Sequence, residues 1–157
     1  MKLTTLETKA VTYEFELAIE APLATVWRCL TEDIDAWWLP DFRMVGPNSK
    51  IQFDSRAGGR LLEVSENGGS LLWYTVLMCV PQESIDMAGH MTAKFGGPST
   101  TMLRLGLKET PTGVLLQVSD AIVGHAKEDS VKRLADGWLW LFRDGLKAYA
   151  EQQNELA

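Results

Sequence analysis

The chain has 157 residues, of which 46% are hydrophobic and 23% are charged, a composition typical of a folded globular protein. Its 21 aspartate and glutamate residues outnumber its 15 lysine and arginine residues, which gives a net charge of −6. An acidic chain lacks the basic surface that nucleic-acid phosphates and anionic lipid headgroups require. We therefore expect neither nucleic acid nor a membrane surface as a partner.

Apolar patterning and cysteine usage indicate a cytoplasmic protein. The longest apolar stretch, residues 71–80, is about half of the ~20 residues that a membrane-spanning helix needs. Glutamates within the first sixteen residues interrupt any apolar segment that would form a signal peptide. Cys29 and Cys79 lie in apolar runs, and we expect buried thiols rather than a disulfide.

The chain begins with a strand followed by short helices. Residues 11–20 alternate between apolar and polar side chains, which predicts a strand with one buried face. Pro22 comes next, and its fixed φ angle suits the first turn of a helix expected over residues 22–31. A second short helix is expected over residues 33–38, and it must end before Pro40.

The middle of the chain is a series of strands separated by turns. The pairs Gly58-Gly59 and Gly68-Gly69 mark tight hairpins, because such turns need positive φ angles that glycine adopts without strain. Residues 71–80 lack clean alternation, which suggests a strand covered on both faces. The expected strands are residues 51–55, 60–64, 71–80, 84–91, 100–108 and 114–123.

The last part of the chain is predicted to form one amphipathic helix of roughly 25 residues, because apolar side chains recur every three or four positions from about Glu128. Gly137 and Gly145 each weaken a helix by ~1 kcal/mol relative to alanine. We therefore expect another element to approach the helix closely at both positions.

These elements predict a single α+β domain over residues 1–157, with a core of about residues 11–151. One helix covers six or seven antiparallel strands only if the sheet curves around it. A curved sheet of this kind tends to leave a space beside the helix. Either side chains or a ligand would fill that space.

Several short segments form a recognisable set in chain order: residues 21–31 (APLATVWRCLT), 34–40 (IDAWWLP), 58–63 (GGRLLE), 69–81 (GSLLWYTVLMCVP), 137–138 (GW) and 145–149 (GLKAY). Together they resemble the START-like superfamily, also called SRPBCC or birch-pollen-allergen-like. They are most similar to its AHSA-like branch, which is related to the activator of the heat-shock-protein ATPase. Tyr74 stands where that branch commonly has glycine after its motif tryptophan.

The resemblance implies a helix-grip fold. In this fold a curved antiparallel sheet of about six or seven strands wraps around a long C-terminal helix, and two short helices follow the first strand. It also implies a hydrophobic ligand cavity between the sheet and that helix. The family includes lipid carriers, polyketide cyclases and aromatases, toxin-resistance proteins and chaperone activators of the stress response, so the fold alone does not decide the function.

Aromatic and methionine side chains favour a binding role. Six tryptophans in a chain of this length exceed what a plain core needs, and tryptophan and methionine line adaptable apolar pockets. Adjacent Trp37 and Trp38 are not expected to point inward together, so one of them would border an opening or a partner. The expected cavity residues are Leu30, Trp37, Trp38, Phe42, Phe53, Leu61, Glu63, Trp73, Leu77, Met87, Met91, Met102, Val118, Trp138, Leu141 and Phe142.

Two carboxylates are the candidates for chemistry. Glu63 stands alone in an apolar strand, and Asp120 shares the parity of the apolar residues in its strand. Each lies either on the outer face, where Glu63 would pair with Arg60 or Arg104, or inward, where burial would raise its pKa. The sequence lacks metal-ligand spacings, a phosphate-binding loop and a nucleophile motif, so we expect neither a metal nor a cofactor.

Three functions remain open. Binding of a small hydrophobic or aromatic molecule, with Glu63 or Tyr74 fixing its orientation, is favoured over catalysis. The second is a cyclase- or aromatase-like enzyme that uses Glu63 or Asp120 as an acid or base. The third is a chaperone-ATPase co-regulator with an exposed face around Trp37 and Trp38. A chaperone and a second copy of the chain, in a homodimer, therefore stay open as further partners.

Overall fold

The computed structural model describes residues 1–157. Its elements follow the order expected from the sequence, with each expected strand found within two residues of its predicted ends. In chain order they are β1 (Lys9–Ile19), α1 (Leu23–Thr31), α2 (Ile34–Trp37), η1 (Pro40–Phe42), β2 (Lys50–Phe53), β3 (Arg60–Val64), β4 (Ser70–Val80), β5 (Ser84–Met91), η2 (Ala93–Phe95), β6 (Ser99–Thr110), β7 (Gly113–Gly124), α3 (Glu128–Trp140), η3 (Leu141–Lys147) and α4 (Ala148–Leu156).

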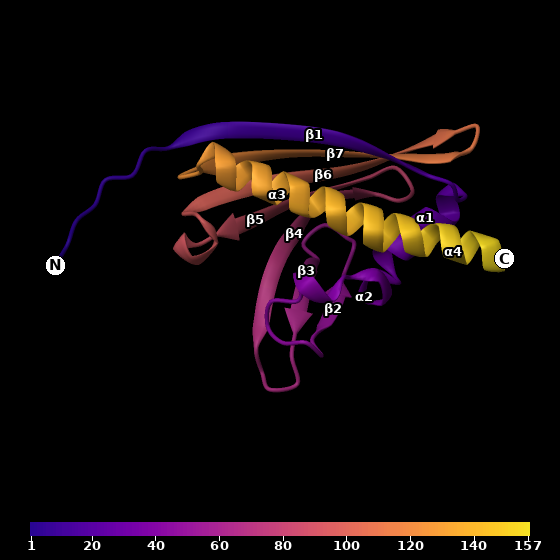
Figure 1. The fold of residues 1–157 in the computed structure, drawn as a ribbon, viewed down its shortest axis with the longest axis horizontal. Coiled ribbons are helices and arrows are strands. Elements are labelled where there is room, and N and C mark those ends of the chain that lie inside the picture. Colours follow the sequence, from indigo (N-terminus) through magenta and orange to yellow (C-terminus); the bar gives the residue numbers. More distant parts are fainter.

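The strands form one seven-stranded antiparallel sheet in the order β1-β7-β6-β5-β4-β3-β2. Consecutive strands from β2 to β7 are neighbours, and β1 pairs with β7 along its whole length. Figure 1 shows the C-terminal helix lying across one face of the sheet, while β2, β3 and β4 curve around it. The predicted α+β helix-grip fold is confirmed.

The C-terminal helix runs without interruption through α3, η3 and α4, from Glu128 to Leu156, and η3 is a π-helix. Close approach is confirmed at Gly145, where an added Cβ would lie 2.6 Å from the carbonyl oxygen of Trp37. The same expectation is wrong at Gly137, because an added Cβ would lie 3.6 Å from the Phe42 ring, an ordinary contact distance.

Two β-bulges explain why β4 lacks alternation. At the first, Leu61 pairs with Tyr74 and Leu62 pairs with Leu72, so Trp73 is the extra residue. At the second, Leu77 is the extra residue, and both Leu77 and Met78 are exposed. The expectation that this strand is covered on both faces is wrong, because each bulge places two consecutive side chains on one side of the sheet.

The core lies between the concave face of the sheet and the helices. Its main cluster contains 25 buried hydrophobic residues, and a smaller cluster surrounds Ile122 near the start of α3. Both cysteines are free thiols, with Cys29 buried and Cys79 half-buried. None of the helices combines the length and hydropathy that crossing a membrane requires.

Candidate ligand-binding site

Aromatic rings from separate parts of the chain meet between the sheet and the C-terminal helix. Trp38, Trp73 and Trp138 pack edge to face around one another, with ring centroids 5.3 to 6.2 Å apart. The rings of Tyr74 and Phe142 lie 5.9 and 5.5 Å from that of Trp138. These five residues, the aromatic cluster, occupy the region in which the sequence places the ligand cavity.

Trp37 and Trp38 both point into the core, with exposed fractions of 4% and 3%. The indole of Trp37 donates to the carbonyl oxygen of Cys29 at 2.7 Å, and that of Trp38 donates to the carbonyl oxygen of Phe42 at 3.2 Å. The expectation that the two side chains do not point inward together is wrong, because α2 ends at Trp37 and Trp38 has extended backbone angles. The chain turns between the two residues, so both rings reach the interior.

The first bulge of β4 places two neighbouring rings in the aromatic cluster. Trp73 contacts Trp38, and Tyr74 contacts Trp138. In an unbroken strand these consecutive side chains would point to opposite faces of the sheet. Gly89 on β5 makes room for the Tyr74 ring, since an added Cβ would lie 3.1 Å from it and 2.7 Å from the Trp73 carbonyl oxygen.

Polar side chains cross the inner face of the sheet next to these rings. We call Tyr13, Thr101, Asp120 and Tyr74 the inner polar row. Tyr13 lies opposite Asp120 in the β1–β7 register, and its hydroxyl donates to Asp120 Oδ2 at 2.8 Å. The Thr101 hydroxyl donates to Asp120 Oδ1 at 2.6 Å. Asp120 therefore faces inward, as one of the two sequence hypotheses expected.

Asp120 is a buried carboxyl group without a cationic partner, since none of the ion pairs of the structure includes it. Burial raises its pKa, and the hydrogen bonds from Thr101 and Tyr13 offset only part of this effect. Burial also raises the pKa of Tyr13 and of Tyr74, and the nearby Asp120 charge adds to both shifts. The inner polar row therefore disfavours any additional negative charge.

The indole nitrogen of Trp138 is a hydrogen-bond donor without an acceptor. Trp138 is 4% exposed, and its Nε1 has no partner in the structure. Indole nitrogen only donates, and a buried donor left unpaired costs about 1–3 kcal/mol. Trp138 and Thr101 lie close enough to the Tyr74 hydroxyl to lower its pKa, but the approach of Trp138 Nε1 does not have the distance and angle of a hydrogen bond.

Glu63 also faces inward and is fully buried. Its Oε1 accepts hydrogen bonds from the backbone nitrogens of Met44 and Val45, at 2.6 and 3.0 Å, and from the Ser49 hydroxyl at 2.7 Å. Its Oε2 accepts one from Trp73 Nε1 at 3.1 Å. Both oxygens are thus occupied by the protein's own donors, and Glu63 fastens the segment before β2 to β3 and β4.

The alternative in which Glu63 lies on the outer face and pairs with an arginine is wrong. Arg104 lies on the outer face of the sheet, where it pairs with both oxygens of Asp86 at 2.7 and 2.8 Å. Arg60 is exposed and takes part in none of the ion pairs. Uncharged hydrogen-bond donors surround Glu63 in place of a cation, because neither arginine side chain lies on the same side of the sheet as Glu63.

Two expected cavity residues lie on the outer face. Leu77 is 56% exposed and Met102 is 44% exposed, so neither lines the interior. Leu77 is turned outward by the second bulge of β4, and Met102 alternates with the buried Thr101 and Leu103. The other expected residues are buried or half-buried; those outside the aromatic cluster are Leu30, Trp37, Phe42, Phe53, Leu61, Glu63, Met87, Met91, Val118 and Leu141.

Sequence reasoning missed Tyr13 and Thr101 as site residues. The alternation of β1 predicts that Tyr13 is inward, but it does not reveal which residue lies opposite on β7. Thr101 is one of two consecutive threonines, and only the strand register shows that it faces Asp120. Register between distant strands was the missing information in both cases.

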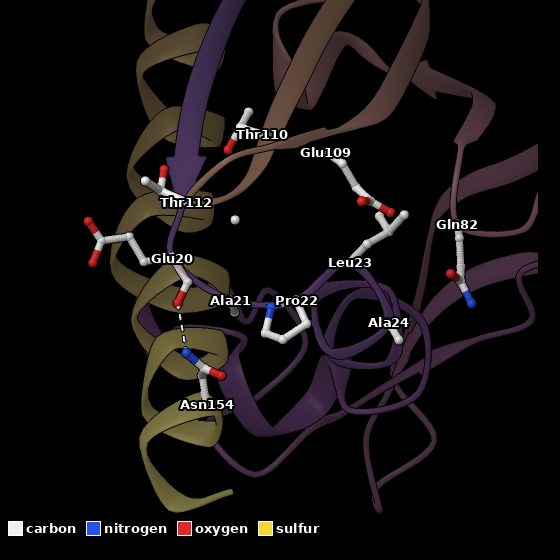
Figure 2. A pocket seen from close by; sticks show the side chains of 11 residues that line it. Glu20, Ala21, Pro22, Leu23, Ala24, Gln82, Glu109, Thr110, Thr112 and Asn154 are labelled. Atoms are coloured by element: carbon white, nitrogen blue, oxygen red, sulfur yellow. Dashed lines mark hydrogen bonds between the residues drawn. The ribbon is translucent and has the colours of Figure 1, made fainter.

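Two open pockets lie elsewhere, at the ends of the elements. Figure 2 shows the residues that line the first, between the start of α1, the β6–β7 turn and α4, with the Glu109 carboxylate extending toward Leu23. The volume of this pocket is about 550 Å³. A second pocket of about 730 Å³ lies between residues 7–9 and 125–129. Polar and charged side chains supply much of both linings, and neither lining contains an expected cavity residue.

Comparison with solved structures supports the fold. A protein of Mesorhizobium loti, MLL2253, is 22% identical with a TM-score of 0.64, covering 90% of this chain and 98% of that one. An uncharacterised protein of Rhizobium leguminosarum is 18% identical with a TM-score of 0.70, covering 95% and 99%. SA2116 of Staphylococcus aureus, of unknown function, is 15% identical with a TM-score of 0.65, covering 96% and 99%.

Comparison with protein families identifies the chain more closely. Among curated proteins, none matches it. A family model described as activator of Hsp90 ATPase homolog 1-like protein matches residues 20–151, which includes every element from α1 to α3 and most of the inner polar row. The match extends over well more than half of the sequence, so the chain belongs to the family of activator of Hsp90 ATPase homolog 1-like proteins.

Proposed function

We propose that the protein binds a small hydrophobic or aromatic molecule between the inner face of its sheet and its C-terminal helix. The observation that carries this proposal is the unpaired indole nitrogen of Trp138, buried among aromatic rings and beside the inner polar row. A plain core rarely retains such a donor, because buried polar groups are almost always hydrogen-bonded. The family match supports the proposal, since ligand binding is among the general roles of the family.

Binding requires the aromatic cluster to rearrange, because its rings occupy the interior. The segment of the C-terminal helix most able to move is α3, because only Val131 and Trp138 of its thirteen residues are buried. The following seven residues, η3, bury four. Segments with few buried apolar contacts open at a lower free-energy cost. We therefore expect α3 to move away from the sheet while η3 stays in place.

A titration with 2-methylnaphthalene tests the proposal. We expect saturable one-to-one binding with a negative heat-capacity change in calorimetry, because apolar surface is removed from water. Intermolecular nuclear Overhauser effects should connect the ligand methyl group to the rings of Trp73 and Trp138. The matched controls Leu77→Thr and Met102→Thr remove apolar side chains from the outer face and should leave the affinity unchanged. Contacts to the outer face alone, or no saturable binding, would contradict the proposal.

Asp120 favours an enzyme as the second candidate function. A carboxyl group with a raised pKa next to two tyrosines is a typical arrangement for acid–base chemistry. A cyclase- or aromatase-like reaction would use the same interior. Under this alternative Asp120→Asn would abolish turnover of a bound substrate while leaving its affinity within a few-fold.

A chaperone partner agrees with the general roles of the family. The face that the sequence assigned to it does not exist, however, because Trp37 and Trp38 are both buried. An interaction with a chaperone would therefore have to use another surface. The unpaired donor of Trp138 and the inner polar row support the interior binding role instead.

A further inference from the structure

The polar groups of the interior differ in what they can still bind. Both oxygens of Asp120 already accept hydrogen bonds, from Tyr13 and Thr101. The indole nitrogen of Trp138 has its single proton free, and the hydroxyl of Tyr74 lies beside it. The free capacity of the site is therefore a donor, which is surrounded by the packed rings of the aromatic cluster.

From this arrangement we infer that the ligand is an aromatic molecule with a neutral carbonyl-type oxygen, which accepts a hydrogen bond from Trp138 Nε1. The inference rests on the proposed function and narrows it to one chemical class. Aromatic rings of the ligand would replace the edge-to-face contact of Trp38 with Trp73 and the stacked contact of Trp138 with Phe142. The carbonyl oxygen would remove the unpaired donor, which a hydrocarbon of the same shape leaves unpaired.

The charges and hydrogen-bond donors of the site disfavour the two closest alternatives, an anionic ligand and a cationic ligand. An anionic ligand, such as an aromatic carboxylate, would place its negative charge near Asp120 in a region without lysine or arginine partners. A cationic ligand would meet the Trp138 donor instead of an acceptor. It would also compete with Tyr13 and Thr101 for the oxygens of Asp120. A neutral acceptor satisfies the donor and adds no charge.

Four naphthalenes of similar size test the chemical class. Three of them, 2-methylnaphthalene, 2-acetylnaphthalene and 2-naphthoate, carry no acceptor, a neutral carbonyl and an anion, and the fourth carries a cation. We expect the ketone to bind about tenfold tighter than the hydrocarbon, the ratio that one buried hydrogen bond supplies. The naphthoate should bind more weakly than the ketone by at least about the same factor. 2-Naphthylmethylamine, the cationic member, should also bind more weakly than the ketone.

The variant Trp138→Phe removes the donor and keeps an aromatic ring. Within this variant the affinity ratio of ketone to hydrocarbon should fall to about one. The control Trp140→Phe changes a tryptophan that is 38% exposed and packs on Phe42, so its ratio should equal that of the unchanged protein. Tyr74→Phe, which keeps the ring that packs on Trp138, should reduce the ratio without abolishing it.

A measurement on the unchanged protein covers the case in which Trp138→Phe does not fold. With ¹⁵N-labelled tryptophan, the ketone should move one indole proton resonance strongly downfield, and the hydrocarbon should not. Overhauser effects to the Tyr74 and Phe142 rings identify that proton as Trp138. Equal affinities for ketone and hydrocarbon would overturn the inference and leave the proposed function standing. Tighter binding of the amine would also overturn it, and absence of binding by all four compounds would overturn both.

Discussion

Glu63 and Asp120 are both buried carboxylates without a cation, yet their surroundings give them different chemistry. Glu63 accepts hydrogen bonds from four donors, two of them backbone nitrogens of the segment before β2. Asp120 accepts bonds from two side-chain hydroxyls, and burial raises its pKa. We therefore assign Glu63 to the fold and Asp120 to the site.

Glu63→Gln should destabilise the protein by about 3 kcal/mol, because an amide nitrogen would face donors and leave buried groups unpaired. The free energy of unfolding in urea measures this cost. Glu66→Gln, at the exposed turn after β3, makes the same chemical change and should alter stability by less than about 0.5 kcal/mol. Equal effects of the two substitutions would show that Glu63 does not fasten the segment.

Asp120 should make stability depend on pH. Its pKa is raised in the folded protein, so the folded state holds the proton more tightly than the unfolded state. The resulting stabilisation is fully present below the unfolded pKa of about 4 and is lost as pH rises through the folded pKa. The stability difference between the unchanged protein and Asp120→Asn, measured by urea unfolding, should therefore decrease as pH rises from about 4. A difference that grows with pH would contradict the assignment.

At the residue scale the sequence left the orientation of both carboxylates open. In the structure Glu63 and Asp120 both face inward. Their partners were not predictable, since the donors to Glu63 come from a loop and those to Asp120 from β1 and β6. Loop conformation and strand register depend on the whole fold, and a local pattern carries little information about either.

At the scale of elements, the C-terminal helix is held against α2 at one glycine. Gly145→Ala should destabilise the protein by about 1–3 kcal/mol, because the added Cβ would lie 2.6 Å from the backbone oxygen of Trp37. Gly137→Ala is the matched control in the same helix, with only an ordinary contact to Phe42, and should stabilise by about 0.5–1 kcal/mol. Thermal unfolding of both variants measures the difference, and a stabilising Gly145→Ala would contradict the close approach.

The elements themselves were predictable because their patterns are strong and local. Alternation identified β1, glycine pairs identified the hairpins around β3, and the period of 3.6 identified the long helix. The bulges of β4 were not predictable, because an extra residue changes which face later side chains occupy. Leu77 was therefore expected inside, whereas the bulge turns it outward. In the same way, the first bulge brings the consecutive residues Trp73 and Tyr74 into contact with one helix side chain, that of Trp138.

At the scale of the molecule, the curved sheet and the helix bring residues together that are far apart in sequence. Tyr13 and Asp120 are 107 positions apart and hydrogen-bonded, and Trp38, Trp73 and Trp138 form one cluster. The fold supplies an interior of aromatic rings with a polar row along one side. The resemblance to the START-like superfamily predicted that fold, but it did not predict that the aromatic rings would fill the interior.

A crystal structure of the protein grown with 2-acetylnaphthalene tests the central claim most directly. We predict electron density for the ligand between Tyr74 and Trp138, with its carbonyl oxygen within about 3.2 Å of Trp138 Nε1 and α3 displaced from the sheet. Density confined to the outer face or to the end pockets, with the aromatic cluster unchanged, would contradict the account.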